Sequence, residues 1–156
     1  YEDDLLSTTG GSIDIPEQYA LGLAVKPIDH LTVALDWQHI SWQNSDTYHE
    51  TFGWRSQDIF RLGAAYELTP EWTIRAGYST TRKQFPSEYT LHNTLLVGIN
   101  PKAATFGVTR SFKNNGELTL GYEYDLSTSS TGSGMSEGTK IHTNMGFVTV
   151  GYGWKF

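Results

Sequence analysis

The 156-residue chain contains no cysteine, so neither a disulfide framework nor a thiolate metal site can form. Its mean hydropathy is low, at -0.40, and no apolar run approaches the roughly 20 residues that a membrane-spanning helix requires. Basic residues are also few, 11 against 17 acidic residues, and the resulting net charge of -6 disfavours nucleic acid as a partner. No stretch shows a convincing 3.6-residue hydrophobic period, which argues against a helical domain.

What the chain does have is aromatic residues, at 13%, 16 glycines, and apolar residues that alternate with polar ones. Alternation of period two is typical of a β-strand with one apolar face. It recurs seven times, which predicts a single all-β domain over residues 1–156. The predicted strands cover residues 19–27, 31 to about 42, 58–68, 72–81, 104–112, 117–126 and 148–156.

Two all-β architectures produce one apolar and one polar face per strand: the soluble β-sandwich and the transmembrane β-barrel. Sandwich strands usually have five or six residues, whereas these run for about nine to twelve. Tyr and Trp also lie near the ends of the apolar faces, as in the aromatic girdles of a membrane barrel. The pattern therefore favours an antiparallel transmembrane β-barrel, with the sandwich as the alternative.

In a barrel the apolar face points to lipid and the polar face to the lumen. The residues expected to face lipid include Leu21, Leu35, Leu62, Ile74, Leu120 and Val150. Arg110 interrupts the apolar face of its strand. The charged residues expected in the lumen are Asp36, Arg61, Glu67, Arg75, Glu117, Glu123, Asp125 and Lys155.

The predicted connections alternate between short and long. Tight turns with Pro, Asn or Gly lie at residues 26–30, 68–71 and 113–116, and long polar loops lie at about 43–57, 82–103 and 127–143. Short turns on one rim and long loops on the other are typical of outer-membrane barrels, whose short turns are periplasmic. We expect the Ser/Thr/Gly tract at 127–134 to be mobile.

The alternating aromatic residues at 151–156, ending in Phe156, resemble the C-terminal assembly signal of outer-membrane barrels. Further motifs follow one another along the chain: Ile15-Pro16-Glu17 with Gly22, Ser41-Trp42, Asp58 with residues 61–66, residues 71–78, residues 90–95 and residues 105–108. In this order and spacing they resemble the FadL/TodX outer-membrane transport family. The similarity covers about residues 13–156.

This resemblance implies a bacterial outer-membrane location, a 14-stranded barrel and an N-terminal hatch, of which this chain supplies seven strands and no hatch. With the last strand running toward the periplasm, the first runs the same way, so residues 1–15 are expected to be the remnant of an extracellular loop. Two copies of such a half could not close on each other, because their edge strands would meet in parallel. The expected partner is the N-terminal half of the same barrel, as a separate fragment or chain.

The resemblance also implies passive uptake of a hydrophobic small molecule, such as a long-chain fatty acid, a hydrocarbon or an aromatic compound, with no catalysis and no cofactor. One alternative is a structural or adhesive barrel, in which side chains would fill the lumen. A barrel lipid hydrolase is another, although we find no nucleophile motif, and the five histidines lack metal-ligand spacing.

Two groups of residues are candidates for substrate binding. Arg61 and Arg75, one strand apart, could meet a polar head group, or could instead belong to an ion-pair ladder that braces the wall. The long loop is unusually apolar and could form a cap with a first binding site, or could simply pack against neighbouring loops. Its candidate residues are Phe85, Leu95, Leu96 and Ile99.

Overall fold

The computed structural model describes residues 14–96 and 101–154. These residues form a seven-stranded antiparallel sheet in which each strand pairs with the next along the chain. The predicted all-β fold with seven strands is confirmed. The strands are β1 (Gln18–Ile28), β2 (Leu31–Ile40), β3 (Gln57–Thr69), β4 (Trp72–Thr80), β5 (Lys102–Ser111), β6 (Gly116–Thr131) and β7 (Lys140–Trp154).

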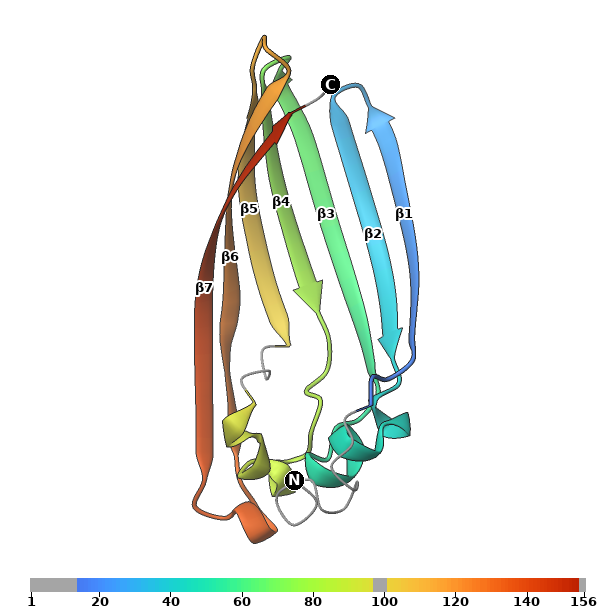
Figure 1. Ribbon diagram of the computed structural model, residues 1–156, viewed down its shortest axis with the longest axis vertical. Coiled ribbons are helices and arrows are strands. Elements are labelled where there is room, and N and C mark those ends of the chain that lie inside the picture. The colour runs from blue at the N-terminus through green and yellow to red at the C-terminus, as the bar shows by residue number, and fades with distance from the viewer. Residues whose placement is uncertain (1–13, 97–100, 155–156) are drawn as a thin grey trace.

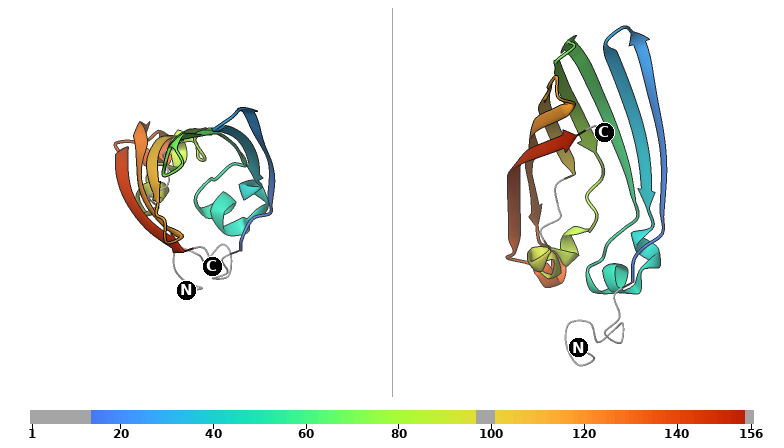
Figure 2. Two further views of the ribbon diagram at one scale, coloured as in Figure 1. Left: turned by 90° about the horizontal axis from the view of Figure 1, so that it is seen from above. Right: turned by 45° about the horizontal axis from the view of Figure 1, so that its top comes forward.

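The sheet curves around a central space, as the view along the strands shows (Figure 2). Its edge strands β1 and β7 are not paired with each other in the described part of the chain, so the sheet is not closed into a barrel. This agrees with the expectation that the chain does not form a closed barrel by itself. The unpaired edges leave backbone donors and acceptors that a continuing antiparallel ladder would satisfy.

The short turns gather at one end of the sheet and the long connections at the other (Figure 1). The β1–β2 and β5–β6 turns are closed by residues with positive φ, His30 at 67° and Asn115 at 62°. The β1–β2 pairing shifts register between Val25 and Ile28, where Pro27 cannot donate a ladder hydrogen bond. The long connections carry the short helical turns η2 (Trp42–Asn44), η3 (Thr47–Thr51), η4 (Ser87–Tyr89), η5 (His92–Leu95) and η6 (Gly134–Ser136).

The strand register places the apolar residues in rows on one face of the sheet. Leu35 is opposite Leu62, and Leu62 is opposite Tyr78, so one apolar row crosses β2, β3 and β4. These side chains are largely exposed, Leu21 at 72% and Leu62 at 54%. A soluble protein rarely exposes so large an apolar surface, whereas a membrane barrel turns such a surface to lipid. The predicted register is confirmed for the apolar face.

The polar residues line the opposite face, and the hollows of this face show that it is the concave one. One hollow extends across five neighbouring strands, and such a space can form only on the inside of the curve. It is lined by residues that include Asp36, Arg61, Gly63, Ser79, Thr105 and Glu123. A second hollow is lined by residues that include Ala65, Arg75, Gly107, Thr119 and Gly121. Arg61, Arg75 and Glu123 therefore face the inside, as predicted.

One predicted loop is wrong in its extent. The tract at 127–134 was expected to be mobile, but β6 continues to Thr131 and pairs with β7 from Thr128 opposite Thr143 to Thr131 opposite Lys140. A register shift between Asp125 and Thr128 precedes this extension. The β-branched threonines suit a pleated strand, and the long hairpin satisfies backbone groups that a loop would leave to water.

No helix in the described ranges is long and apolar enough to cross a membrane. Buried apolar side chains are instead concentrated at the long-loop end, around Phe52, Trp54 and Phe85. The sheet itself has no interior core of its own, because one face is exposed and apolar and the other lines the central space.

The two faces can be distinguished by placing the same charge on each. Ala64 lies in the middle of the apolar face, opposite Val33 and Ala76, whereas Ala34 lines the concave face. We expect Ala64→Arg to lower the free energy of unfolding in a bilayer by about 2–4 kcal/mol, because the guanidinium would enter hydrocarbon. Ala34→Arg should change it much less, and equal losses, measured by denaturant titration in lipid vesicles, would contradict the assigned faces.

Candidate functional site

The candidate site is the concave face of the sheet together with the loops at its long-loop end. The middle of this face is lined almost entirely by small residues from β2 to β6. The register aligns Ala34, Gly63, Gly77 and Thr105 in one row. The next row contains Ala65, Arg75, Gly107 and Gly121. The side chains of this small-residue band, except for Arg75, extend little into the central space.

Close packing does not require glycine at every position of this band. A Cβ built on Gly121 would have its nearest contact 3.7 Å away, at Thr149 Cβ, and one built on Gly63 would lie 3.9 Å from the carbonyl oxygen of Ala76. Both are ordinary van der Waals distances, and neither residue has a positive φ. Glycine inside a strand lowers stability, by roughly 0.5–1 kcal/mol relative to alanine. These glycines therefore keep the inside open at some expense of strand stability.

The two arginines predicted as binding residues both lie on the concave face, in different surroundings. Arg61 is aligned between Asp36 and Ser79 and donates a hydrogen bond from Nη2 to Gln38 Oε1, at 2.8 Å. It also shares its hollow with Glu123.

Arg75 lies within the small-residue band and hydrogen-bonds the hydroxyl of Thr109, which is itself 2.8 Å from the hydroxyl of Thr119. None of the residues lining the hollow of Arg75 is acidic. Arg75 is therefore the arginine with the weaker charge compensation, a difference that sequence spacing does not reveal.

The long connections form a folded cap at the mouth, near the strand ends (Figures 1 and 2). Its centre is an aromatic cluster in which the Trp54 ring stacks on Tyr48 at 4.9 Å and meets the edge of Trp42 at 4.6 Å, measured between ring centroids. Phe85, from the β4–β5 connection, is 2% exposed and packs into this cluster from the other loop. Phe85 thus packs against a neighbouring loop, the second of the two readings that the sequence allowed.

Asn93 joins the same two loops through buried hydrogen bonds. Its Oδ1 accepts from Trp54 Nε1 at 2.7 Å, and its Nδ2 donates to the carbonyl oxygens of Phe52 at 2.8 Å and Tyr89 at 2.9 Å. Gly53, between Phe52 and Trp54, has a φ of 68°, and a Cβ there would lie 2.4 Å from the Tyr89 ring. Glycine is therefore required at this close approach.

The tip of the β6–β7 hairpin is hydrogen-bonded to the β4–β5 connection. Thr90 Oγ1 and Ser130 Oγ are 2.9 Å apart, and both residues are fully buried. Ser136 Oγ donates to the carbonyl oxygen of Glu88 at 2.5 Å and accepts from the backbone N–H of Leu91 at 3.0 Å. All three long connections are thereby tied into one cap, an arrangement that the sequence analysis missed.

The remaining residues predicted in the loop differ in how exposed their side chains are. Leu95 is 72% exposed, and Leu91, beside it in the loop, is 50% exposed. Leu96 is partly buried against the aromatic cluster. Ile99 and Val97 lie outside the described residues.

Asp14 anchors the start of the described chain to the cap by accepting a hydrogen bond from Ser45 Oγ at 2.9 Å. Desolvation acts to raise the pKa of Asp14, but the hydrogen bonds from Ser45 and from the backbone N–H groups of Thr47 and Asp46 together hold this pKa below its usual value. The anchor thus uses the ionised carboxylate, and it is lost only when the pH falls through that lowered pKa.

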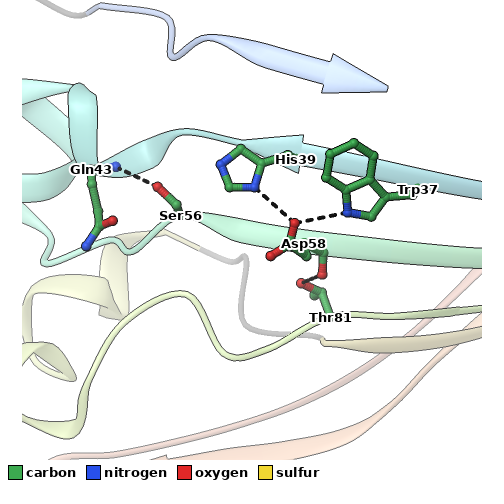
Figure 3. A network of polar contacts seen from close by, with 6 residues as sticks. All are labelled: Trp37, His39, Gln43, Ser56, Asp58 and Thr81. Atoms are coloured by element: carbon green, nitrogen blue, oxygen red, sulfur yellow. Dashed lines mark hydrogen bonds and ion pairs between the residues drawn. The ribbon is translucent and has the colours of Figure 1, made fainter. Parts of the chain in front are cut away.

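On the apolar face, a polar network marks the rim near the cap (Figure 3). Asp58 Oδ1 accepts a hydrogen bond from Trp37 Nε1 at 3.0 Å and lies 3.0 Å from His39 Nδ1. Thr81 Oγ1 donates to the Asp58 carbonyl oxygen at 2.9 Å. Trp37 and Asp58 follow the alternation of the apolar residues, so this network has the position of an interfacial aromatic girdle.

Groups suited to metal binding or covalent catalysis are sparse. The described residues contain no cluster of three or more His, Asp or Glu that could hold a metal ion. Ser127 Oγ and His142 Nε2 lie 3.2 Å apart, but none of the contacts found in the described ranges gives this imidazole an acidic partner. This pair therefore lacks the third group that orients the base in a catalytic triad.

The fold is that of a membrane-spanning antiparallel β-barrel. It is defined by long strands, an outward apolar face, a hollow inner face, and short turns at one rim with long connections at the other. Solved structures of TodX are among those that it resembles. No protein-family model matches the chain, and no curated protein matches it.

The Pseudomonas putida toluene transporter TodX matches with a TM-score of 0.64 and 19% identity over 88% of this chain and 34% of that one. A TodX deltaS2S3 mutant, described as a monoaromatic hydrocarbon channel, matches with a TM-score of 0.71 and 20% identity over 91% of this chain and 36% of that one. The chain therefore has the fold of about one third of the TodX structures it matches.

Proposed function

We propose that this chain is the C-terminal part of a FadL/TodX-type outer-membrane channel, which takes up hydrophobic small molecules by passive diffusion. The observation that carries the proposal is the small-residue band on the concave face. Gly63 and Gly121 have room for a side chain yet carry none, so the space they leave is not a packing requirement. A structural or adhesive barrel would fill that space with its own side chains.

The likeness to TodX supports the same proposal at the level of the fold, because the TodX structures are described as a toluene transporter and a monoaromatic hydrocarbon channel. By this proposal seven further strands, from a separate fragment or chain, complete a 14-stranded barrel. They would pair with the edges of β1 and β7, which are unpaired in the described chain. Within residues 14–96 and 101–154, the Ser127–His142 contact is all that favours the hydrolase alternative.

Adjacent alanines on β3 provide a matched test of the channel. Ala65 lines the concave hollow, whereas Ala64 is one residue away on the apolar face. We expect Ala65→Phe to reduce uptake of a neutral aromatic hydrocarbon several-fold, because the ring would narrow the passage, and Ala64→Phe to leave uptake unchanged. Uptake is measured in cells that carry each variant at equal amounts of assembled barrel. Normal uptake by Ala65→Phe would contradict a route along this face.

The arginines are proposed to interact with the polar head of an acidic substrate. Arg75→Ala should reduce uptake of a long-chain fatty acid and leave that of a neutral aromatic unchanged, because only the acid carries a carboxylate. Arg61→Ala should have the smaller effect, since Asp36 and Glu123 share the surroundings of Arg61. If both variants take up both substrates normally, the arginines have only a structural role.

The apolar loop is proposed as the first binding site, with Leu95 as its exposed residue and Leu96 beside it. Phe85 would support the site from the buried cluster, and the predicted residue Ile99 lies outside the described residues. Leu95 supports this proposal because its apolar side chain is exposed in the same loop whose Phe85 is buried in the cap. The double change of Leu95 and Leu96 to Ser should weaken uptake at low substrate concentration and leave assembly intact. Thr94→Ser, at an exposed neighbouring position, is the control. An unchanged concentration dependence would remove the loop from the binding site.

A further inference from the structure

Arg110 is a charged residue on the apolar face of the sheet, and it has no role in the proposed uptake. It lies on β5 opposite Trp72 of β4 and Leu118 of β6, and Tyr152 of β7 continues the same row. This row lies near the short-turn ends of β4 to β7. The next row toward the cap is wholly apolar apart from a tyrosine hydroxyl, and consists of Leu31, Tyr66, Ile74, Val108, Leu120 and Val150.

Two aromatic rings hold the Arg110 guanidinium. Its Cζ lies 5.3 Å from the centroid of the Trp72 ring and 5.3 Å from that of the Phe112 ring. Both distances are within the range of a cation–π interaction. Such contacts engage the planar faces of the guanidinium and leave the N–H donors at its edge available.

No contact found among the described residues uses those donors. The ion pairs found there are His30–Glu67 and His39–Asp58, and no hydrogen bond from Arg110 to an acceptor is found in that part of the chain. A guanidinium presents five N–H groups in a rigid fork that fits a phosphate or carboxylate in a bidentate manner. The described part of the protein thus orients a cation on its outer surface and supplies no anion for it.

The position of Arg110 indicates which anion it meets. An arginine on the lipid face is costly at the midplane but costs only about 0–1 kcal/mol near the interface. Aromatic rings at the same level, Trp72, Phe112 and Tyr152, mark that interface. The phosphate of a phospholipid lies at this depth, and its acyl chains would run along the apolar row of Ile74, Val108 and Leu120.

We propose that Arg110, held between Trp72 and Phe112, binds the phosphate group of a membrane phospholipid at the short-turn rim of the barrel. This inference rests on the proposed outer-membrane location but not on the proposed transport activity. Lys102 provides a matched control, because it lies on the same strand and the same face at the opposite rim, opposite Thr80.

The test is native mass spectrometry of the full-length barrel extracted from membranes and titrated with phosphatidylglycerol. We expect Arg110→Gln to weaken retention of the lipid by roughly tenfold, the scale of one charge-assisted bidentate contact. Arg110→Lys should also weaken it, because an ammonium group cannot form the planar fork. Lys102→Gln should retain the lipid as the unchanged protein does.

Three results would overturn the proposal: normal retention by Arg110→Gln, equal loss from Arg110→Gln and Lys102→Gln, or displacement of the lipid by the same concentration of inorganic phosphate. Heat-modifiable migration on a gel verifies that each variant is assembled. If Arg110→Gln does not assemble, Trp72→Leu removes one ring while keeping the charge and should weaken retention in the same way. Hydrocarbon uptake by assembled Arg110→Gln should be unchanged, so a failure of this inference is separate from a failure of the transport proposal.

Discussion

The antiparallel ladder of backbone hydrogen bonds is the constraint on which the other features depend. In hydrocarbon no water is present to satisfy an unpaired N–H or C=O, so every strand must have a partner on each side. Pairing in sequence order meets this demand for β2 to β6, and it fixes which side chains face each way. The outward apolar rows, the small-residue band and the girdles at both rims all follow from that one register.

Within this paired sheet, the concave face is shaped so that the central space stays open. A strand pair brings opposing side chains close together, so an open interior requires residues that do not extend inward. Gly63, Gly107 and Gly121 supply this, and Arg75 is the exception that places a charge in the space they leave. In the described residues, the wall of the sheet and the open space inside it therefore depend on the same strand positions.

Sequence alternation predicted the strands and both faces because period two is a direct consequence of the pleat. It could not predict the extended β6–β7 hairpin, since Ser, Thr and Gly occur both in loops and in strands that pack on other loops. A cap, or packing of the long loop against its neighbours, was among the expectations, but the contacts that join the loops were beyond reach, because Trp54 and Asn93 meet across 39 residues of sequence. Arg110 was visible as an interruption of the apolar face, and Phe112 is two residues further along the same segment. Trp72, however, comes from β4, and only the register brings its ring to Arg110.

The interlocking of the three long connections has a consequence for protein engineering. Asn93 joins the first to the second, and Ser130 and Ser136 join the third to the second. Transplanting one of these loops from another barrel would remove partners from the other two and leave buried polar atoms unsatisfied. Chimeras built at this end of the sheet should therefore exchange all three connections as a set.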